Sequence, residues 1–89
     1  MKIIRINADE ALWRNNMLPE GILERWLVAD GDTAHEGHAV AQIRIESALH
    51  DVVAPATGRL AISAPTLAVI EPGFLLATLA VDTVVASGV

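Results

Sequence analysis

The chain has 89 residues, a net charge of −5 and no cysteine. This length fits one domain, which buries about 60–65% of the surface that its unfolded chain exposes. Without cysteine there are no disulfides and no zinc–thiolate site. The excess of 11 acidic over 6 basic residues argues against nucleic acid as a partner, since phosphate binding needs clustered Lys and Arg.

Hydrophobic residues make up 53% of the chain, which argues against an intrinsically disordered segment. No apolar run approaches the ~20 residues that cross a bilayer. Residues 1–6 also lack the length and the cleavage site of a signal peptide. We therefore expect a cytoplasmic protein with no membrane partner.

Short β-strands separated by turn residues are predicted along most of the chain. The first covers Lys2–Asn7, and a loop with one helical turn is expected at residues 8–16, where Asp9 suits an N-cap. Turn residues such as Asp30-Gly31-Asp32 separate the later segments. The later strands are predicted over Gly21–Val28, Ala39–Ile45, Leu49–Val53, Leu60–Ser63, Ala68–Ile70 and Phe74–Leu79. The apolar tail, residues 81–89, is expected either to add an edge strand or to fray.

A weak internal repeat divides the chain into two similar units. Pro19-Glu20-Gly21 recurs as Pro55-Ala56-Thr57-Gly58, and the turn 34–37 recurs as 70–73, at offsets of 36 or 37 residues. Neither unit can bury its own apolar face, so two units related by a pseudo-twofold axis would cover each other. We predict an all-β chain forming a flattened β-barrel of two roughly four-stranded sheets, with the hairpin near residues 45–49 projecting at one end.

The segment Glu20–Asp32 contains a Glu-Gly pair, an apolar strand with Trp26-Leu27-Val28, and a Gly-Asp turn. Together with Gly37 and the segment 54–58, this order resembles the lipoyl/biotinyl-carrier domain family, most closely the lipoyl domains of 2-oxoacid dehydrogenase acyltransferases. The resemblance makes residues 1–89 a single lipoyl-like domain. Its core is residues 17–80, preceded by an N-terminal strand and inserted loop at 1–16 and followed by the tail.

That resemblance implies the barrel-sandwich hybrid fold and a carrier role in a multienzyme complex. In such complexes the lipoylated domain shuttles acyl groups between active sites and contributes no catalytic residue. We therefore expect that the chain is not by itself an enzyme.

The resemblance also implies a modified lysine at the hairpin tip, within an Asp-Lys-Ala triplet. Counting back from Ala54-Pro55 places this position at Ser47, between Glu46 and Ala48, whereas the only lysine is Lys2. Lipoate attachment needs an amine that forms a stable amide, and a serine hydroxyl is a poor nucleophile without an adjacent base. The methionine-flanked lysine of biotinyl domains is absent as well.

We therefore predict that Ser47 is unmodified and that the chain carries no lipoyl cofactor. The expected role is a non-carrier interaction or assembly module. Its expected protein partners are components of a 2-oxoacid dehydrogenase-type complex.

Three other interpretations are compatible with this resemblance, and two of them are disfavoured. The first is a true carrier whose lysine is lost in this copy. Another modification of Ser47, such as phosphopantetheine, is disfavoured because acyl carrier proteins place that serine at a helix start. A barrel-sandwich adaptor of the membrane-fusion type is disfavoured because the connection Ile45–Leu49 is too short for a long helical hairpin.

The histidines suggest another alternative, a metal-binding or enzymatic site near the tip. His35, His38 and His50 are candidate ligands, with Asp51 and Glu46 nearby. Solvated turn and strand histidines explain them more simply, so no metal is predicted.

Each tryptophan has its own interpretation. Trp26 lies in the most apolar strand and is expected in the core. Trp13, with Leu12 and Met17, forms either an exposed partner-binding patch or a segment packed over one end of the barrel.

Overall fold

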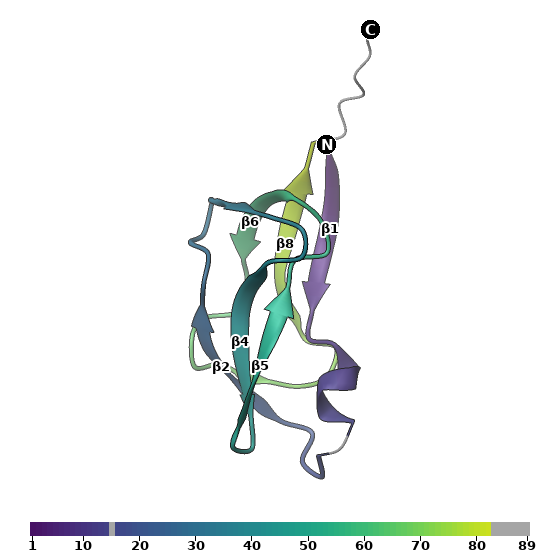
Figure 1. Ribbon diagram of the computed structural model, residues 1–89, viewed down its shortest axis with the longest axis vertical. Coiled ribbons are helices and arrows are strands. Elements are labelled where there is room, and N and C mark those ends of the chain that lie inside the picture. The colour runs from purple at the N-terminus through teal and green to yellow at the C-terminus, as the bar shows by residue number, and fades with distance from the viewer. Residues whose placement is uncertain (15, 83–89) are drawn as a thin grey trace, which may run out of the picture.

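The computed structural model describes residues 1–14 and 16–82, which form two four-stranded antiparallel sheets around one core (Figure 1). The first sheet has the order β1 (Lys2–Asn7), β8 (Leu75–Val81), β6 (Gly58–Ile62), β3 (Thr33–Ala34). The second has the order β5 (Ala48–Val53), β4 (Ala39–Ile45), β2 (Gly21–Trp26), β7 (Val69–Ile70). The prediction of an all-β chain with two roughly four-stranded sheets is confirmed.

Most predicted strands are found, with shifts at their ends. Lys2–Asn7 and Ala39–Ile45 have the bounds expected from the sequence, whereas the predicted strand 21–28 ends at Trp26. The two-residue strand β3 was missed, because two residues cannot show an alternating pattern. Of the tail, Val81 ends β8, and residues 83–89 lie outside the described residues. Within the described part of the chain, no helix is long and apolar enough to cross a membrane.

The two sheets have corresponding strand orders. Strands one repeat apart occupy equivalent places in the two sheets: β6 corresponds to β2, β8 to β4 and β7 to β3. The remaining strand, β1, stands where β5 stands in the other sheet. The burial patterns of β1 and β5 are identical. The backbone after each of these strands is held alike, since Ala8 N donates to Phe74 O over 2.8 Å and Ala54 N donates to His38 O over 2.9 Å. The N-terminal strand therefore occupies, beside β8, the place that β5 occupies beside β4.

A β-bulge in each sheet allows two consecutive residues to be buried. The pairing of β4 with β5 shifts between Ala39 and Ala41, and the pairing of β8 with β1 shifts so that Leu76 has no partner in β1. In a regular strand, neighbouring side chains point to opposite faces of the sheet. The extra residues Val40 and Leu76 are both fully buried.

The core lies between the sheets and is aliphatic. Its largest fully buried side chains come from both sheets: Leu23, Val40, Ile43, Ile45, Leu60, Ile70, Leu76 and Leu79. Fully burying such a side chain contributes about 1.5–3 kcal/mol. The shared core is therefore the main interaction that holds the sheets together.

Two polar contacts join the turns to the sheets. Gly31 adopts a φ of 89°, as expected for the Asp-Gly turn, and the Asp30 carboxylate accepts a hydrogen bond from Ile62 N over 2.8 Å. Trp26 was predicted in the core but is only half-buried. Its indole N–H donates to Ala64 O over 2.9 Å, so the ring lies at the edge of the core, where that bond can form.

Gly58 permits the close approach of β6 to β8. A Cβ atom at this residue would lie 2.7 Å from Ala80 O and 3.1 Å from Ala80 C. We expect Gly58→Ala to destabilise the fold by about 1–3 kcal/mol, because backbone atoms must shift. Urea unfolding checks this, with exposed Ala61→Val on the same strand as the control, expected within about 0.5 kcal/mol of wild type. Equal stabilities of the two variants would contradict the close approach.

Candidate functional site at the hairpin tip

The hairpin joining β4 to β5 projects at the lower end of the molecule in Figure 1. Ile45 pairs with Ala48, so the loop consists of only two residues, Glu46 and Ser47. Ile45 is fully buried, whereas Glu46, Ser47 and Ala48 are exposed. The structure thus presents the three residues singled out from the sequence on a short loop anchored in the core.

The loop conformation places strain at Glu46. Its φ is 56°, while Ser47 is not among the described residues with positive φ. A positive φ favours glycine, which has no Cβ atom to clash there. A left-handed conformation costs a residue with a Cβ atom about 1–2 kcal/mol. The sequence pattern did not reveal this strain, because glutamate is not a residue typical of such turns.

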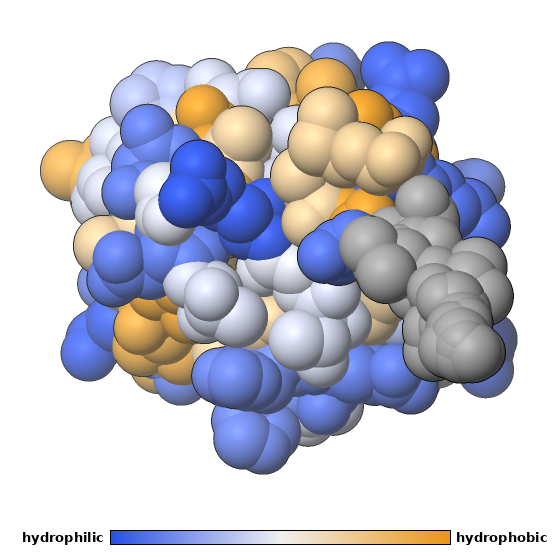
Figure 2. All heavy atoms as spheres, turned by 90° about the horizontal axis from the view of Figure 1, so that it is seen from above, coloured by the Kyte–Doolittle hydropathy of each residue, from blue (hydrophilic) through white to orange (hydrophobic). Residues whose placement is uncertain are grey.

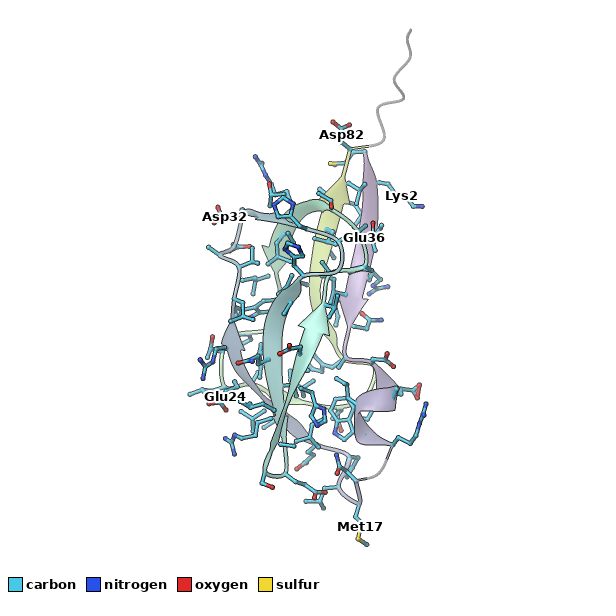
Figure 3. The ribbon with its side chains drawn as sticks, viewed as in Figure 1. Lys2, Met17, Glu24, Asp32, Glu36 and Asp82 are labelled. Carbon is cyan, nitrogen blue, oxygen red and sulfur yellow. The ribbon has the colours of Figure 1, made fainter. Side chains whose placement is uncertain are left out.

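The Ser47 hydroxyl is exposed, and within residues 1–14 and 16–82 its oxygen has no hydrogen-bond partner. The only lysine, Lys2, pairs with Val81 at the other end of the molecule (Figure 3). The tip therefore carries no amine.

Polar bonds between side chains lie beside exposed apolar residues on the outer face of the sheet above the tip, where Leu49 stands opposite Arg44. Arg44 Nε donates to Glu24 Oε1 over 2.9 Å, and Gln42 Nε2 donates to Asp51 Oδ1 over 3.1 Å. The side chains of Arg44 and Glu24 are 47% and 29% exposed, so their ion pair contributes at most about 1 kcal/mol.

The histidines do not come together at the tip. His35 and His38 lie in the turn before β4, with ring centroids 5.8 Å apart. The two rings thus lie near each other, although side chains that flank Gly37 in a turn were not expected to converge. The length of β4, about 20 Å, separates them from the tip, whereas His50 lies on β5 three residues after Ser47.

His35 and His38 are exposed, as expected for solvated turn histidines, whereas His50 on β5 is partly exposed. His50 is half-buried, and its buried Nε2 has no partner, because β5 packs this side chain partly beneath the surface. Among the described residues, no group of three or more His, Cys, Asp or Glu could hold a metal ion. Figure 2 views the end opposite the tip and shows hydrophilic and hydrophobic residues interspersed there.

The inserted loop packs against the core, so the interpretation of Trp13 as part of an exposed patch is wrong. Trp13 is only 6% exposed, and Leu12 packs partly buried against the core. Asp9 Oδ1 accepts from Ala11 N over 2.9 Å and begins the 3-10 helix η1 (Glu10–Trp13), as predicted for the helical turn. Met17 is 95% exposed. Burying the indole removes its large apolar surface from water, although its N–H is left without a partner.

A small groove beside the tip was not found from the sequence. It has a volume of about 150 Å³ and lies between the loop before β2 and the edge strand β7. Exposed Leu18 and Val69 line it together with Glu46 and Arg44. These residues are distant in the chain, so no local motif connects them.

Comparison with models of protein families and with curated proteins gave no match to this sequence. The chemistry of the site is therefore judged from its geometry. The tip presents an exposed serine and an exposed carboxylate on a two-residue loop, beside a groove lined by both apolar and charged residues.

We expect Glu46→Gly to stabilise the protein by about 1 kcal/mol, because glycine adopts the positive φ without steric cost. Thermal unfolding by circular dichroism measures the change. Ser47→Gly is the matched control, and it should lower stability slightly, since it only adds freedom to the unfolded chain. A Glu46→Gly variant less stable than wild type would show that the loop is not strained at this residue.

We expect Trp13→Ala to destabilise the fold by about 3–5 kcal/mol, as other truncations of buried aromatic residues do. Met17→Ala, a few residues along the same loop, should change stability by less than about 0.5 kcal/mol. Denaturant titration followed by far-UV circular dichroism compares the two variants. Similar small effects of both would argue that the loop does not pack against the core in solution.

Proposed function

We propose that this chain is a lipoyl-domain-like protein that acts as a non-carrier interaction or assembly module. The observation that carries the proposal is the exposed two-residue hairpin tip, which has Ser47 at the position expected for the family's lysine. The proposed partners are proteins, components of a 2-oxoacid dehydrogenase-type complex, in the cytoplasm. In this role the domain contributes a binding surface and no catalytic residue.

The arrangement of the strands supports the proposed family. We describe the two sheets as a flattened, barrel-sandwich fold with a pseudo-twofold axis relating β2–β5 to β6–β8 and β1. The corresponding strand orders and the matched bulges at Val40 and Leu76 support this description. The hairpin that joins the two units is then the projecting element at which the resemblance expects the attachment site.

The chemistry of the tip supports a role without a swinging arm. An amide to lipoate needs a primary amine, and Ser47 supplies only a hydroxyl without a base. Lys2 lies at the opposite end of the fold, beside β8, and cannot stand in for the missing residue.

The intact mass of the protein purified from its native cell tests the proposal. We expect the mass of the unmodified polypeptide, since the tip lacks the attachment chemistry. Peptide mapping over residues 45–53 is the accompanying measurement. An acyl, lipoyl or phosphopantetheine adduct at Ser47 would overturn the non-carrier role.

A second candidate, a carrier whose lysine is lost in this copy, is favoured by one observation. Glu46 and Ala48 still flank Ser47 on an exposed hairpin tip, like the acidic residue and alanine of the family's triplet. Incubating Ser47→Lys with a lipoate ligase separates the candidates, with Ser47→Arg as a control that has a long cationic side chain and no acylatable amine. Efficient lipoylation would favour recent loss, whereas an unmodified Ser47→Lys would support the non-carrier module.

A further inference from the structure

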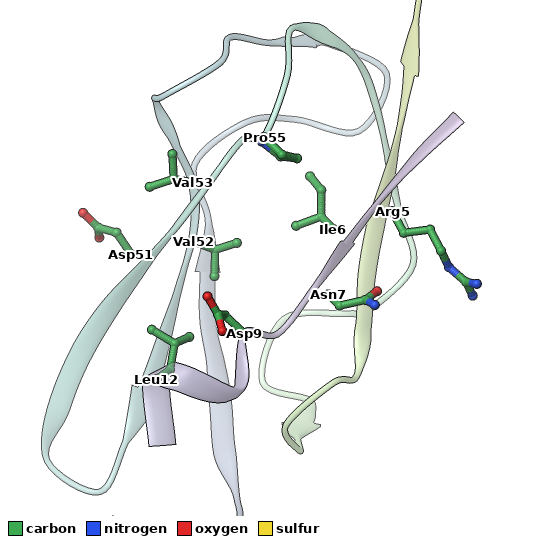
Figure 4. Close-up of a pocket in the computed structure, with 9 residues that line it drawn as sticks. All are labelled: Arg5, Ile6, Asn7, Asp9, Leu12, Asp51, Val52, Val53 and Pro55. Atoms are coloured by element: carbon green, nitrogen blue, oxygen red, sulfur yellow. The ribbon is translucent and has the colours of Figure 1, made fainter. Parts of the chain in front are cut away.

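A cleft of about 340 Å³ opens between the edge strands β1 and β5 (Figure 4). The Asp51 carboxylate accepts a hydrogen bond from Gln42 and points away from the cleft, and the Asp9 carboxylate caps η1. Ile6 and Val52 at its floor are only 3% and 7% exposed. The lining therefore offers neither a negative rim nor an accessible apolar floor that would select a partner.

Two exposed histidine rings lie close together in the turn that precedes β4. His38 N donates to His35 O over 3.0 Å, so these two residues are the first and fourth of a β-turn, whose Cα atoms lie less than about 7 Å apart. Gly37 occupies the third position with a φ of 85°, which glycine adopts without steric cost. The turn thus brings the two rings to a centroid separation of 5.8 Å while both side chains stay exposed.

Hydrogen bonds to neighbouring segments hold this turn in place. Gly37 N donates to Ala54 O over 3.0 Å, and Ala54 N donates to His38 O over 2.9 Å. Glu36 N donates to the hydroxyl oxygen of Thr57 over 3.0 Å. Because the fold already orders the backbone of the turn, a ligand that joins the two imidazoles does not bear that cost, and such preorganisation favours binding.

The separation of the rings suits two imidazoles bound to one metal ion. Metal–nitrogen distances of about 2.0–2.1 Å place the ring centroids of two imidazoles about 5 Å apart around a tetrahedral ion. The two rings need to approach by roughly 1 Å, and rotation of exposed side chains supplies such a movement. Imidazole nitrogen suits Zn²⁺, Cu²⁺ and Ni²⁺, whereas Mg²⁺ and Ca²⁺ prefer oxygen ligands.

We propose that His35 and His38 bind one divalent transition-metal ion of the Zn²⁺ type through their imidazole nitrogens. Water completes the coordination, because two protein ligands leave two positions of a tetrahedral ion open. The site lies at the end of β4 away from the hairpin tip, in the turn that contains Glu36 (Figure 3). It uses two side chains rather than a larger cluster near the tip, and it is independent of the interaction role proposed above.

A titration with Zn²⁺ followed by NMR of the histidine rings tests the site, since the chain has only three histidines. The ring signals of His35 and His38 should shift together and saturate at one ion per chain. The ring of His50, on β5, should stay unchanged and serves as the internal control. Mg²⁺ at the same concentrations should shift none of the three rings, although the chain has a net charge of −5.

A set of glutamine variants assigns the binding to the two rings. His35→Gln and His38→Gln should each weaken Zn²⁺ binding at least about tenfold in isothermal titration calorimetry, because the remaining imidazole binds without an intramolecular second ligand. His50→Gln is the matched control and should bind Zn²⁺ as the wild-type protein does. Far-UV circular dichroism checks that each variant is folded, and the His50 ring signal of the wild-type protein replaces the control if His50→Gln does not fold.

The absence of ring shifts at millimolar Zn²⁺, or a shift of only one of the two rings, would overturn the proposal. Equal affinities of the two glutamine variants and the wild-type protein would assign the bound ion to other groups and would overturn it as well. Saturation at one ion per two chains would replace the single-chain site by one shared between two copies. These results are independent of the intact mass at Ser47, so the metal site and the non-carrier role are tested separately.

Discussion

The structure depends on one core that neither sheet can bury alone. Each sheet has one apolar face, and the largest buried side chains, such as Leu23 and Leu79, come from opposite sheets. Because the two sheets cover each other, the packing of these side chains sets both the distance between the sheets and the position of one sheet over the other. The bulges at Val40 and Leu76 add a further buried side chain to each sheet, so the strands fill the core more densely than strict alternation would allow.

The core fixes the position of the hairpin tip. Ile45 is fully buried immediately before the loop, so the two residues beyond it are held outside the sheets. Glu46 adopts an unfavourable φ there, and the packing of β4 against β5 compensates for the cost. The covalent chemistry of a lipoyl carrier needs an amine, which this exposed loop lacks.

The edges of the sheets give the molecule a second surface with different physical properties. The tip presents exposed side chains on a short loop. The cleft between β1 and β5 is lined by residues of two edge strands. The inserted loop links the two surfaces, since Trp13 anchors it in the core while Asp9 and Leu12 line the cleft.

The sequence by itself determined the all-β class, the bounds of Lys2–Asn7 and Ala39–Ile45, and a hairpin near Ser47, because alternating patterns and turn residues are local signals. Only the tertiary structure decided that β1 completes the sheet of the second repeat unit, since that pairing joins the two ends of the described chain. Tertiary packing also buried Trp13 and part of His50, and it left the edges of β1 and β5 facing one cleft. Such contacts arise between residues far apart in the chain, where no periodicity or turn motif records them.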